Sequence, residues 1–344
     1  MTVRPRKVLA VGAVFLLALV ASGRPGGAAE EGAFRVVVAV SGTLNHIPNF
    51  VGLEKGFFLK HGLDAKLKVY QLGQHMSQAV QAGEAQLSGA AFSNFPVAVD
   101  RGFTSKAVVG MLGDSTSKYS DDPLALITRR DTGITQVRDL VGRKVGLPLG
   151  GTAHLYLGIA LKRNSIPVEK VQVINVGNAS MVSALTERLV DAVLPIEPYA
   201  ELTLEKVPQA VLVQRGGSLV GYHIPMAATI DLMERQPEVV YRYAVGLAEA
   251  EQFARQHPDE AAEVATRWVP GLELPIAKKA MRNMRFDPRI TKHTLDSWDE
   301  NVRTLLEQKK MRQPVPWTRA IDLKFIQRVE KEYPQFFSDL KPVP

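Results

Sequence analysis

The sequence predicts an α/β protein of two lobes, each a mostly parallel β-sheet flanked by helices, with a helical C-terminal tail. Strand-like and helix-like segments alternate from residue 34 to about residue 215, and this alternation is typical of parallel sheets covered by helices. From about Asp231 the strand signals stop and helical stretches run to the end. The chain of 344 residues is longer than one ordinary domain and suits two.

The first lobe begins with short apolar runs, typical of strands, that are separated by helical segments. In the first half of the chain, strands are expected at Phe34–Val40, Asp64–Tyr70, Gln86–Ala90, Lys106–Met111 and Pro123–Thr128. Helices are expected there at Phe50–Lys60, Met76–Ala82 and Phe95–Arg101. Gly62 and Gly83 follow the first two helices, at the position where glycine commonly ends a helix.

The second lobe repeats this pattern and the tail does not. Strands are expected at Lys144–Leu147, Val171–Val176, Asp191–Pro195 and Val211–Gln214, with helices at Ala153–Asn164 and Ala179–Arg188. Tail helices, separated by prolines, are expected at Asp231–Gln256, Asp259–Arg267, Pro275–Met284, Thr291–Lys310 and Thr318–Glu332. We expect the tail to pack on the first lobe. Lobe 1 is then residues 34–125 and 225–344, and lobe 2 is residues 126–224.

The N-terminus has the features of a cleaved export signal. Basic residues precede an apolar run of 14 residues, Val8–Ala21, which is shorter than the roughly 20 residues that span a bilayer. Gly27 and Ala29 fit cleavage after Ala29, so residues 1–29 are expected to be a signal peptide. An uncleaved membrane anchor is the alternative. We therefore expect a periplasmic protein.

Charge and cysteine content argue against several classes of protein. Residues 1–29 carry four of the 42 basic residues and none of the 35 acidic ones, so cleavage would lower the net charge from +7 to +3. No basic run supports nucleic-acid binding. The chain has no cysteine, which excludes disulfides, thiolate–metal sites and cysteine nucleophiles. It also has no P-loop, dinucleotide-binding or hydrolase-nucleophile motif.

A glycine turn is the first candidate for a ligand site. Residues 146–158 read Gly-Leu-Pro-Leu-Gly-Gly-Thr-Ala-His-Leu-Tyr-Leu-Gly, which predicts a strand end, a turn and a helix start. Glycine lets the backbone approach a ligand closely. The first N–H groups of a helix have no internal partner and lie at the positive end of its dipole. The turn therefore suits an anion, although a plain strand-to-helix connection is the alternative.

Five segments follow one another in an order that indicates a family. They are Asn45–Asp64 with its Glu-Lys-Gly-Phe-Phe core, Gln81–Gly89, Val137–Gly146, Gly150–His154 and Leu189–Tyr199. In this order they resemble segments of the periplasmic binding proteins for nitrate, sulfonates and taurine, over roughly residues 34–215. The resemblance implies the type II periplasmic binding protein fold.

The resemblance also implies a hinged molecule that holds a small anionic or zwitterionic ligand between its lobes. The closed form would then dock on an ABC permease in the inner membrane. The polar run Asp114–Asp122 suits a segment that crosses between lobes and allows hinge motion. Such a protein needs no chemical step, so we expect no enzyme activity, no cofactor and no metal, and we expect a monomer.

Candidate ligand-binding residues lie in loops after four of the expected strands, because ligands of such sheets bind at the carboxyl ends of the strands. They are Thr43, Asn45 and His46; Ser93 and Asn94; Gly151, Thr152, Ala153 and His154; and Glu197 and Tyr199. Most of them are uncharged groups, as suits a small anion held by backbone and hydroxyl donors.

Several of these residues have a structural alternative. Ser93 and Asn94 could instead cap the next helix. His46 could be an exposed turn residue. His154 and Tyr199 could pack within their own lobe.

Glu197 is the acidic residue among the candidates. A carboxylate that faces the cleft would repel a simple anion and would favour a ligand that also carries an amine, an amidine or hydroxyl donors. Alternatively, Glu197 lies on the rim and helps to dock the permease.

The ligand itself stays open. Sulfonates, taurine and nitrate are the first candidates, and a thiamine-precursor pyrimidine or an aromatic acid is the alternative. The protein could also be a ligand-sensing partner of a membrane receptor. An enzyme like the fungal pyrimidine synthase is less favoured, because that enzyme carries a cysteine-rich segment and this chain has no cysteine.

Overall fold

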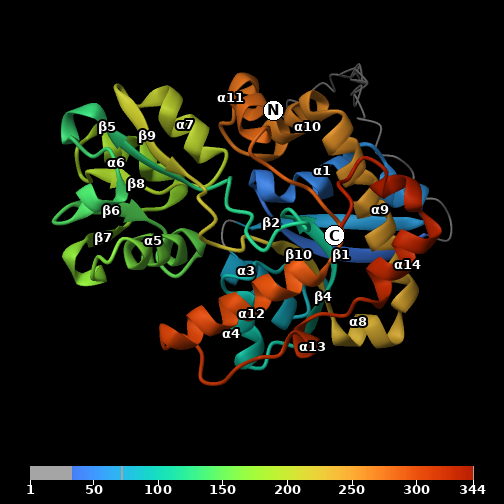
Figure 1. Cartoon of the computed structure of the whole chain (residues 1–344). Coiled ribbons are helices and arrows are strands. Elements are labelled where there is room, and N and C mark those ends of the chain that lie inside the picture. Colours follow the sequence, from blue (N-terminus) through green and yellow to red (C-terminus); the bar gives the residue numbers. More distant parts are fainter. Residues whose placement is uncertain (1–32, 71–72, 344) are drawn as a thin grey trace, which may run out of the picture.

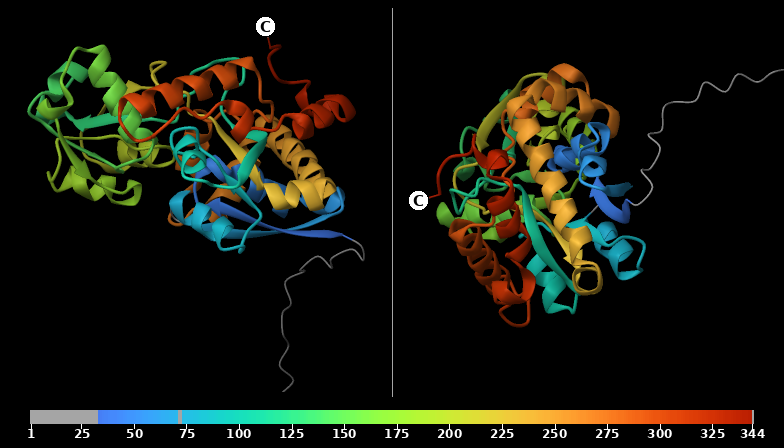
Figure 2. Two further views of the ribbon diagram at one scale, coloured as in Figure 1. Left: turned by 90° about the horizontal axis from the view of Figure 1, so that it is seen from below. Right: turned by 90° about the vertical axis from the view of Figure 1, so that its right-hand side faces the viewer.

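The structure, a computed structural model, describes residues 33–70 and 73–343. The expected signal peptide at residues 1–29 lies outside the described residues. Two lobes are visible in Figure 1: the middle of the chain forms one lobe, drawn in green, and the segments before and after it share the other. Figure 2 shows the same separation from two further sides.

The first sheet contains five strands in the order β2-β1-β3-β10-β4. Their bounds are β1 Phe34–Ser41, β2 Leu63–Tyr70, β3 Leu87–Gly89, β4 Ser105–Leu112 and β10 Ile224–Thr229. Strand β1 runs parallel to β2 and β3, whereas β10 runs antiparallel to β3 and β4. Val38 and Val40 of β1 are fully buried, as expected of a strand in a sheet covered on both faces.

The second sheet also contains five strands, in the order β7-β6-β8-β5-β9. Their bounds are β5 Ala125–Arg129, β6 Lys144–Leu147, β7 Gln172–Asn175, β8 Ala192–Val193 and β9 Ala210–Arg215. Strand β6 runs parallel to β7 and β8, and β5 runs antiparallel to β8 and β9. The prediction of two mostly parallel sheets is confirmed, with one reversed strand in each.

Two crossing segments join the lobes, and each leads into the reversed strand of the sheet that it enters. Residues 113–124 connect β4 to β5, and residues 216–223 connect β9 to β10. The carboxylate of Asp121, which is 3% exposed, accepts N–H bonds from residues 218–220 at 3.2, 2.7 and 3.2 Å. The two crossing segments are therefore tied together where a hinge would lie.

Strand β10 is one element that the sequence analysis did not predict. Its run Ile224-Pro-Met-Ala-Ala-Thr229 contains a proline, which argues against a central strand because proline cannot donate to the ladder. The structure places Pro225 where the register of β10 against β4 shifts. Tyr222 and His223, which immediately precede β10, therefore lie at the edge of the first sheet where β1 and β3 end.

Helices of the first lobe connect its strands. They are α1 Ile47–Glu54, α2 Phe57–Lys60, α3 Gly73–Gln81 and α4 Phe95–Asp100. The single helix expected at Phe50–Lys60 is instead two helices, since Gly56 has a φ of 76° and breaks the backbone between them.

The second lobe has three helices, α5 Thr152–Arg163, α6 Met181–Thr186 and α7 Tyr199–Lys206. Helices α5 and α6 correspond to the expected ones. Helix α7 was not expected. It buries only Ala200 and Thr203, so its sequence has almost no apolar stripe from which to predict it.

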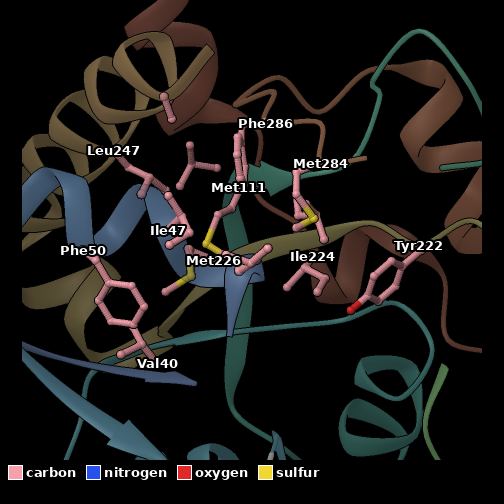
Figure 3. Packing of buried hydrophobic residues seen from close by; sticks show 14 of the residues in the cluster. Val40, Ile47, Phe50, Met111, Tyr222, Ile224, Met226, Leu247, Met284 and Phe286 are labelled. Atoms are coloured by element: carbon pink, nitrogen blue, oxygen red, sulfur yellow. The ribbon is translucent and has the colours of Figure 1, made fainter. Parts of the chain in front are cut away.

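The tail helices are α8 Ile230–Arg235, α9 Pro237–Gln256, α10 Pro258–Trp268, α11 Leu274–Met281, α12 Lys292–Glu307, α13 Trp317–Ala320 and α14 Lys324–Glu332. They pack on the first lobe, as predicted: Tyr243 of α9 stacks on Phe58 of α2, and Trp268 of α10 stacks on Phe50 of α1, with ring centroids 5.4 and 4.7 Å apart. Figure 3 shows the buried cluster between α1, α9 and the sheet. No helix in the described ranges is long and apolar enough to cross a membrane.

Candidate functional site

The loop after β1 places the predicted residues Thr43, Asn45 and His46 at the edge of the first sheet that faces the second lobe. The hydroxyls of Ser41 and Thr43 are 2.8 Å apart and share a hydrogen bond. The side-chain amide of Asn45 donates to the hydroxyl of Tyr222 at 2.8 Å, and its Oδ1 is buried without a partner in the described structure. The loop after β1 is therefore held against the second crossing segment.

His46 is buried rather than an exposed turn residue, so that alternative is wrong. Its ring is 2% exposed and lies over Gly89, where a Cβ atom would be only 2.6 Å from the ring. Burial lowers the pKa of His46 to about 3. The side chain is therefore neutral, and its Nδ1 has no hydrogen-bond partner among the described groups.

His223 is a second buried histidine at the same edge, and the sequence analysis missed it. It is 3% exposed, and burial lowers its pKa to about 4. The backbone of Ser117 and Lys118 in the first crossing segment opposes this lowering of the pKa, and Nε2 is buried with no partner in the described structure. In a neutral imidazole one nitrogen donates and the other accepts, so the unbonded Nε2 is available to a hydrogen-bonding group of a ligand.

The glycine turn has the geometry that the sequence predicts. Gly150 has a φ of 79°, Gly151 is extended, and helix α5 starts at Thr152. The N–H groups of Thr152 and Ala153 have no helical acceptor, because they are the first donors of the helix. The side chain of Thr152 is buried, and Ala153 is 1% exposed.

His154 folds back over this turn. Its Nδ1 accepts a bond from the N–H of Gly150 at 3.2 Å, and the side chain is half-buried. Burial and the charge of Lys310 both lower the pKa of His154. Lys310, just beyond α12, is half-buried and has no carboxylate within 4.0 Å among the described residues.

Ser93 and Thr152 join the two lobes directly. Ser93 follows β3 of the first sheet, Thr152 starts α5 of the second lobe, and their hydroxyl oxygens are 2.7 Å apart. Both side chains are 6% exposed. Asn94, in contrast, is exposed, and it makes no side-chain capping bond to α4 although it occupies the N-cap position. The structure therefore brings Ser93 to the interface between the lobes and leaves Asn94 outside it.

Glu197 is not on an exposed rim, and through Asn283 of the first lobe it takes part in the contact between the lobes. Its side chain is fully buried and forms an ion pair with Arg215. It also accepts bonds from Asn283 at 2.7 Å and from the N–H of Glu201 at 3.2 Å. Burial raises the pKa of Glu197 to about 7, and Arg215 opposes this shift. The contacts of this carboxylate are thus all with protein groups, and it is not on an exposed rim.

Tyr199 starts helix α7 next to Glu197. Its ring is half-buried, and burial raises the pKa of its hydroxyl. Its carbonyl accepts a bond from the hydroxyl of Thr203 at 2.7 Å, within α7. The ligand-binding roles of Tyr199 and Glu197 stay predictions.

Charged contacts also connect the lobes at two further pairs of helices (Figure 1). Helix α7 meets α11 through Lys206 with Glu273 at 2.7 Å and Lys279 with Glu205 at 2.6 Å. Helix α5 meets α12 through Lys162 and Glu307 at 3.0 Å. The lobes of the structure are therefore in direct contact with one another.

These residues differ in how well the sequence could indicate them. Loops after strands are found from the strand pattern, which indicates Ser93 and Thr152. Tyr222 and His223 precede an unpredicted strand, and Asn283 and Lys310 lie in the tail, so no local pattern pointed to them. Only the folded arrangement places them beside the predicted loops.

Comparison with known proteins identifies a family that this chain matches. The family model described as NMT1/THI5 like matches residues 43–261. A protein of Brucella abortus that is named only for a binding role is 27% identical over 230 residues, which cover 64% of this chain and 66% of that protein. The match thus spans slightly less than two thirds of the length of that relative.

Solved structures share the fold at low sequence identity. The periplasmic aliphatic sulphonate binding protein SsuA from Escherichia coli superimposes with a TM-score of 0.73 at 16% identity, covering 84% of this chain and 92% of that one. For the periplasmic nitrate-binding protein NrtA from Synechocystis PCC 6803 the TM-score is 0.68 at 12% identity, with 88% and 89% covered. The desulfurization enzyme DSZB also matches, with a TM-score of 0.64 at 15% identity over 87% and 99%. The expected periplasmic binding protein fold is confirmed.

Proposed function

The chain belongs to the NMT1/THI5-like family, and from this membership and the contact between its lobes we propose that it is the solute-binding component of an ABC importer. It captures a small anionic or zwitterionic solute between the lobes and delivers it to a membrane permease. Binding selects the closed form, so no chemical step is needed.

The hydrogen bond between Ser93 and Thr152 is the observation that carries this proposal. It joins the strand-end loops of two sheets that are otherwise connected through the crossing segments. The free N–H groups at the start of α5 lie at the same point, where they suit an anion. A solute bound there would contact both lobes at once and would favour closure.

Charge around the turn supports an anionic group on the solute. Lys310 acts on His154 electrostatically, and it has no carboxylate partner among the described residues. Uncharged donors and one cation suit a sulfonate, which can accept several hydrogen bonds.

Unpaired acceptors favour a solute that also donates. Nε2 of His223 and Oδ1 of Asn45 are buried and without partners in the described structure, and burying an unpaired polar group costs about 1–3 kcal/mol. An amine would satisfy them, so we favour a taurine-like zwitterion over nitrate. This reasoning replaces the one from Glu197, whose carboxylate is already bonded.

The screen that tests this proposal is thermal unfolding of the mature protein with taurine, alkyl sulfonates, nitrate, aromatic acids and aminopyrimidines. A solute at about 100 times its Kd should stabilise the fold by roughly 2.7 kcal/mol. Stabilisation by taurine or an alkyl sulfonate supports the proposal. Stabilisation by a pyrimidine or an aromatic acid alone would favour the alternative ligand class, and no response to any of them would contradict a solute-binding role for these classes.

An enzyme or a sensor would behave differently in two further assays. Mass spectrometry of the bound solute should recover it unchanged, whereas a product would point to an enzyme, as in the structurally similar DSZB. Deletion of the gene should abolish uptake of the solute. Normal uptake with a lost transcriptional response would instead point to a sensing role.

Export is the last part of the proposal. The apolar run Val8–Ala21 and the small residues before Glu30 support cleavage after Ala29. The mature protein should start at Glu30 and appear in the osmotic-shock fraction, as checked by N-terminal sequencing. Retention of Met1 on a membrane-bound product would contradict this.

A further inference from the structure

A cavity lies in the first lobe, beside the first crossing segment. It has a volume of about 400 Å³, opens to solvent, and is lined by the first crossing segment, helices α9 to α11, the segment that follows α11, and the C-terminal residues 339–341. Cavities of roughly 300–1,000 Å³ commonly hold small molecules. None of the residues of the candidate site discussed above lines it.

One part of the wall of this cavity is apolar. Met281, Met284, Phe286 and Leu340 all contribute to it, and the first three are 4–6% exposed. Figure 3 shows the side chains of Met284 and Phe286 close to one another at the edge of the buried cluster. Such a wall favours the apolar body of an organic molecule, because burying apolar surface is favourable.

Most charges that line the cavity are already paired. Arg255 binds Asp339, Arg289 binds Asp287, and Lys278 binds Asp259. The charge of Lys341 acts on Asp114. Within these pairs the positive and negative charges balance one another.

Two of the cations that line the cavity are solvent-exposed and have no carboxylate partner in the described part of the chain. Arg282 and Arg285 have no carboxylate within 4.0 Å among the described residues. Arg285 is held in place, because its Nη1 donates to the carbonyls of Arg282 and Met284 at 2.9 Å each. Its remaining N–H groups stay available, and guanidinium groups match the planar geometry of a carboxylate.

We propose that this cavity is a second binding site, for a small organic anion with an aromatic or branched aliphatic body. The apolar wall holds the body, and Arg282 and Arg285 hold the carboxylate or sulfonate. Gly113, Asp114 and Thr116 of the first crossing segment form part of the same wall, so the bound anion would touch the segment that links the lobes.

Methionine methyl NMR on the full mature chain tests this, with 2-naphthoate as the probe. Met281 and Met284 line the cavity, whereas Met181 is buried in the second lobe. We expect saturable shifts of the Met281 and Met284 methyl signals and none for Met181. The neutral 2-naphthamide should bind at least about tenfold more weakly, since it lacks the charge that the two arginines recognise.

The double variant Arg282→Gln/Arg285→Gln should raise the Kd for 2-naphthoate about tenfold. The matched control Arg138→Gln/Lys331→Gln removes two exposed cations outside the cavity and should leave the Kd unchanged. Absent shifts at Met281 and Met284, or an affinity that the first variant does not change, would overturn the proposal. The NMR shifts and the Kd values are both measured with 2-naphthoate, so they do not depend on which solute binds between the lobes.

Discussion

Two buried histidines, His46 and His223, make the edge of the first sheet sensitive to acid. Burial lowers their pKa values to about 3 and about 4 in the folded protein, whereas a histidine in the unfolded chain has a pKa near 6.5. Between these values the unfolded chain binds more protons than the folded one. The stability that the neutral rings contribute is therefore complete above about pH 6.5 and is lost as the pH falls toward 4.

Each histidine should lower the free energy of unfolding by about 1.4 kcal/mol per pH unit over this range. Urea unfolding at several pH values between about 7.5 and 4.5 measures this dependence. The variant His223→Gln cannot titrate, so its stability should fall less steeply than that of the parent. Parallel pH dependences for the two proteins would contradict the assignment.

Residue types in the loops could be predicted from the sequence, but their partners could not. The strand pattern placed Ser93, Thr152 and Glu197 after strands. That Thr152 bonds to Ser93, and that Glu197 is neutralised by Arg215, depends on residues 59 and 18 positions away. Such pairs depend on how whole elements pack against one another. A local sequence pattern carries no information on that packing.

At the scale of the element, the start of α5 is the part of the site that can be tested alone. Thr152→Pro removes one N–H donor and the hydroxyl that bonds to Ser93, while Gly151 already has the extended backbone that precedes proline. Fold stability should change little, because proline suits the first helical position. Affinity for the anionic solute should fall by about 1–3 kcal/mol.

The variant Thr152→Ala is the matched control, because it removes the hydroxyl and keeps the N–H. Titration calorimetry on both variants separates the two groups. If Thr152→Pro binds as tightly as Thr152→Ala, the N–H of Thr152 does not contact the solute.

The ion pairs between α7 and α11 should stabilise the closed lobes. Lys206 with Glu273 and Lys279 with Glu205 connect helices of different lobes, and each exposed pair contributes roughly 0.2–1 kcal/mol. The variant Lys206→Gln/Lys279→Gln should weaken solute binding by up to about 1.5 kcal/mol, because closure is coupled to binding.

The control is Lys278→Gln, which breaks a pair with Asp259 inside the first lobe and should leave solute affinity unchanged. Calorimetry at low salt measures both, since salt screens exposed pairs. Equal affinities for the double variant, the control and the parent would show that these pairs do not contribute to closure.

Most elements were predictable because their apolar periodicity is strong. The exceptions have physical reasons: β10 contains Pro225, α7 has almost no apolar stripe, and Gly56 divides one expected helix in two. The fold could be inferred despite these errors, because the alternation of strands and helices in both lobes was intact.

At the scale of the whole molecule, the two crossing segments allow one lobe to move relative to the other. Asp121 ties the segments together through residues 218–220, so they should bend as a unit. The described structure has its lobes in contact through Ser93 and Thr152. Solute binding between them should therefore shift the population toward this closed arrangement.

The measurement that tests this most directly is the distance between spin labels on the two lobes with and without solute. The chain has no native cysteine, so Lys170→Cys in the second lobe and Lys331→Cys in the first, both exposed, would carry the only labels. We expect a broad distribution without solute that narrows to a single closed distance when the solute found by thermal unfolding is added. A solute that binds with measurable affinity and leaves the distribution unchanged would contradict binding between the lobes.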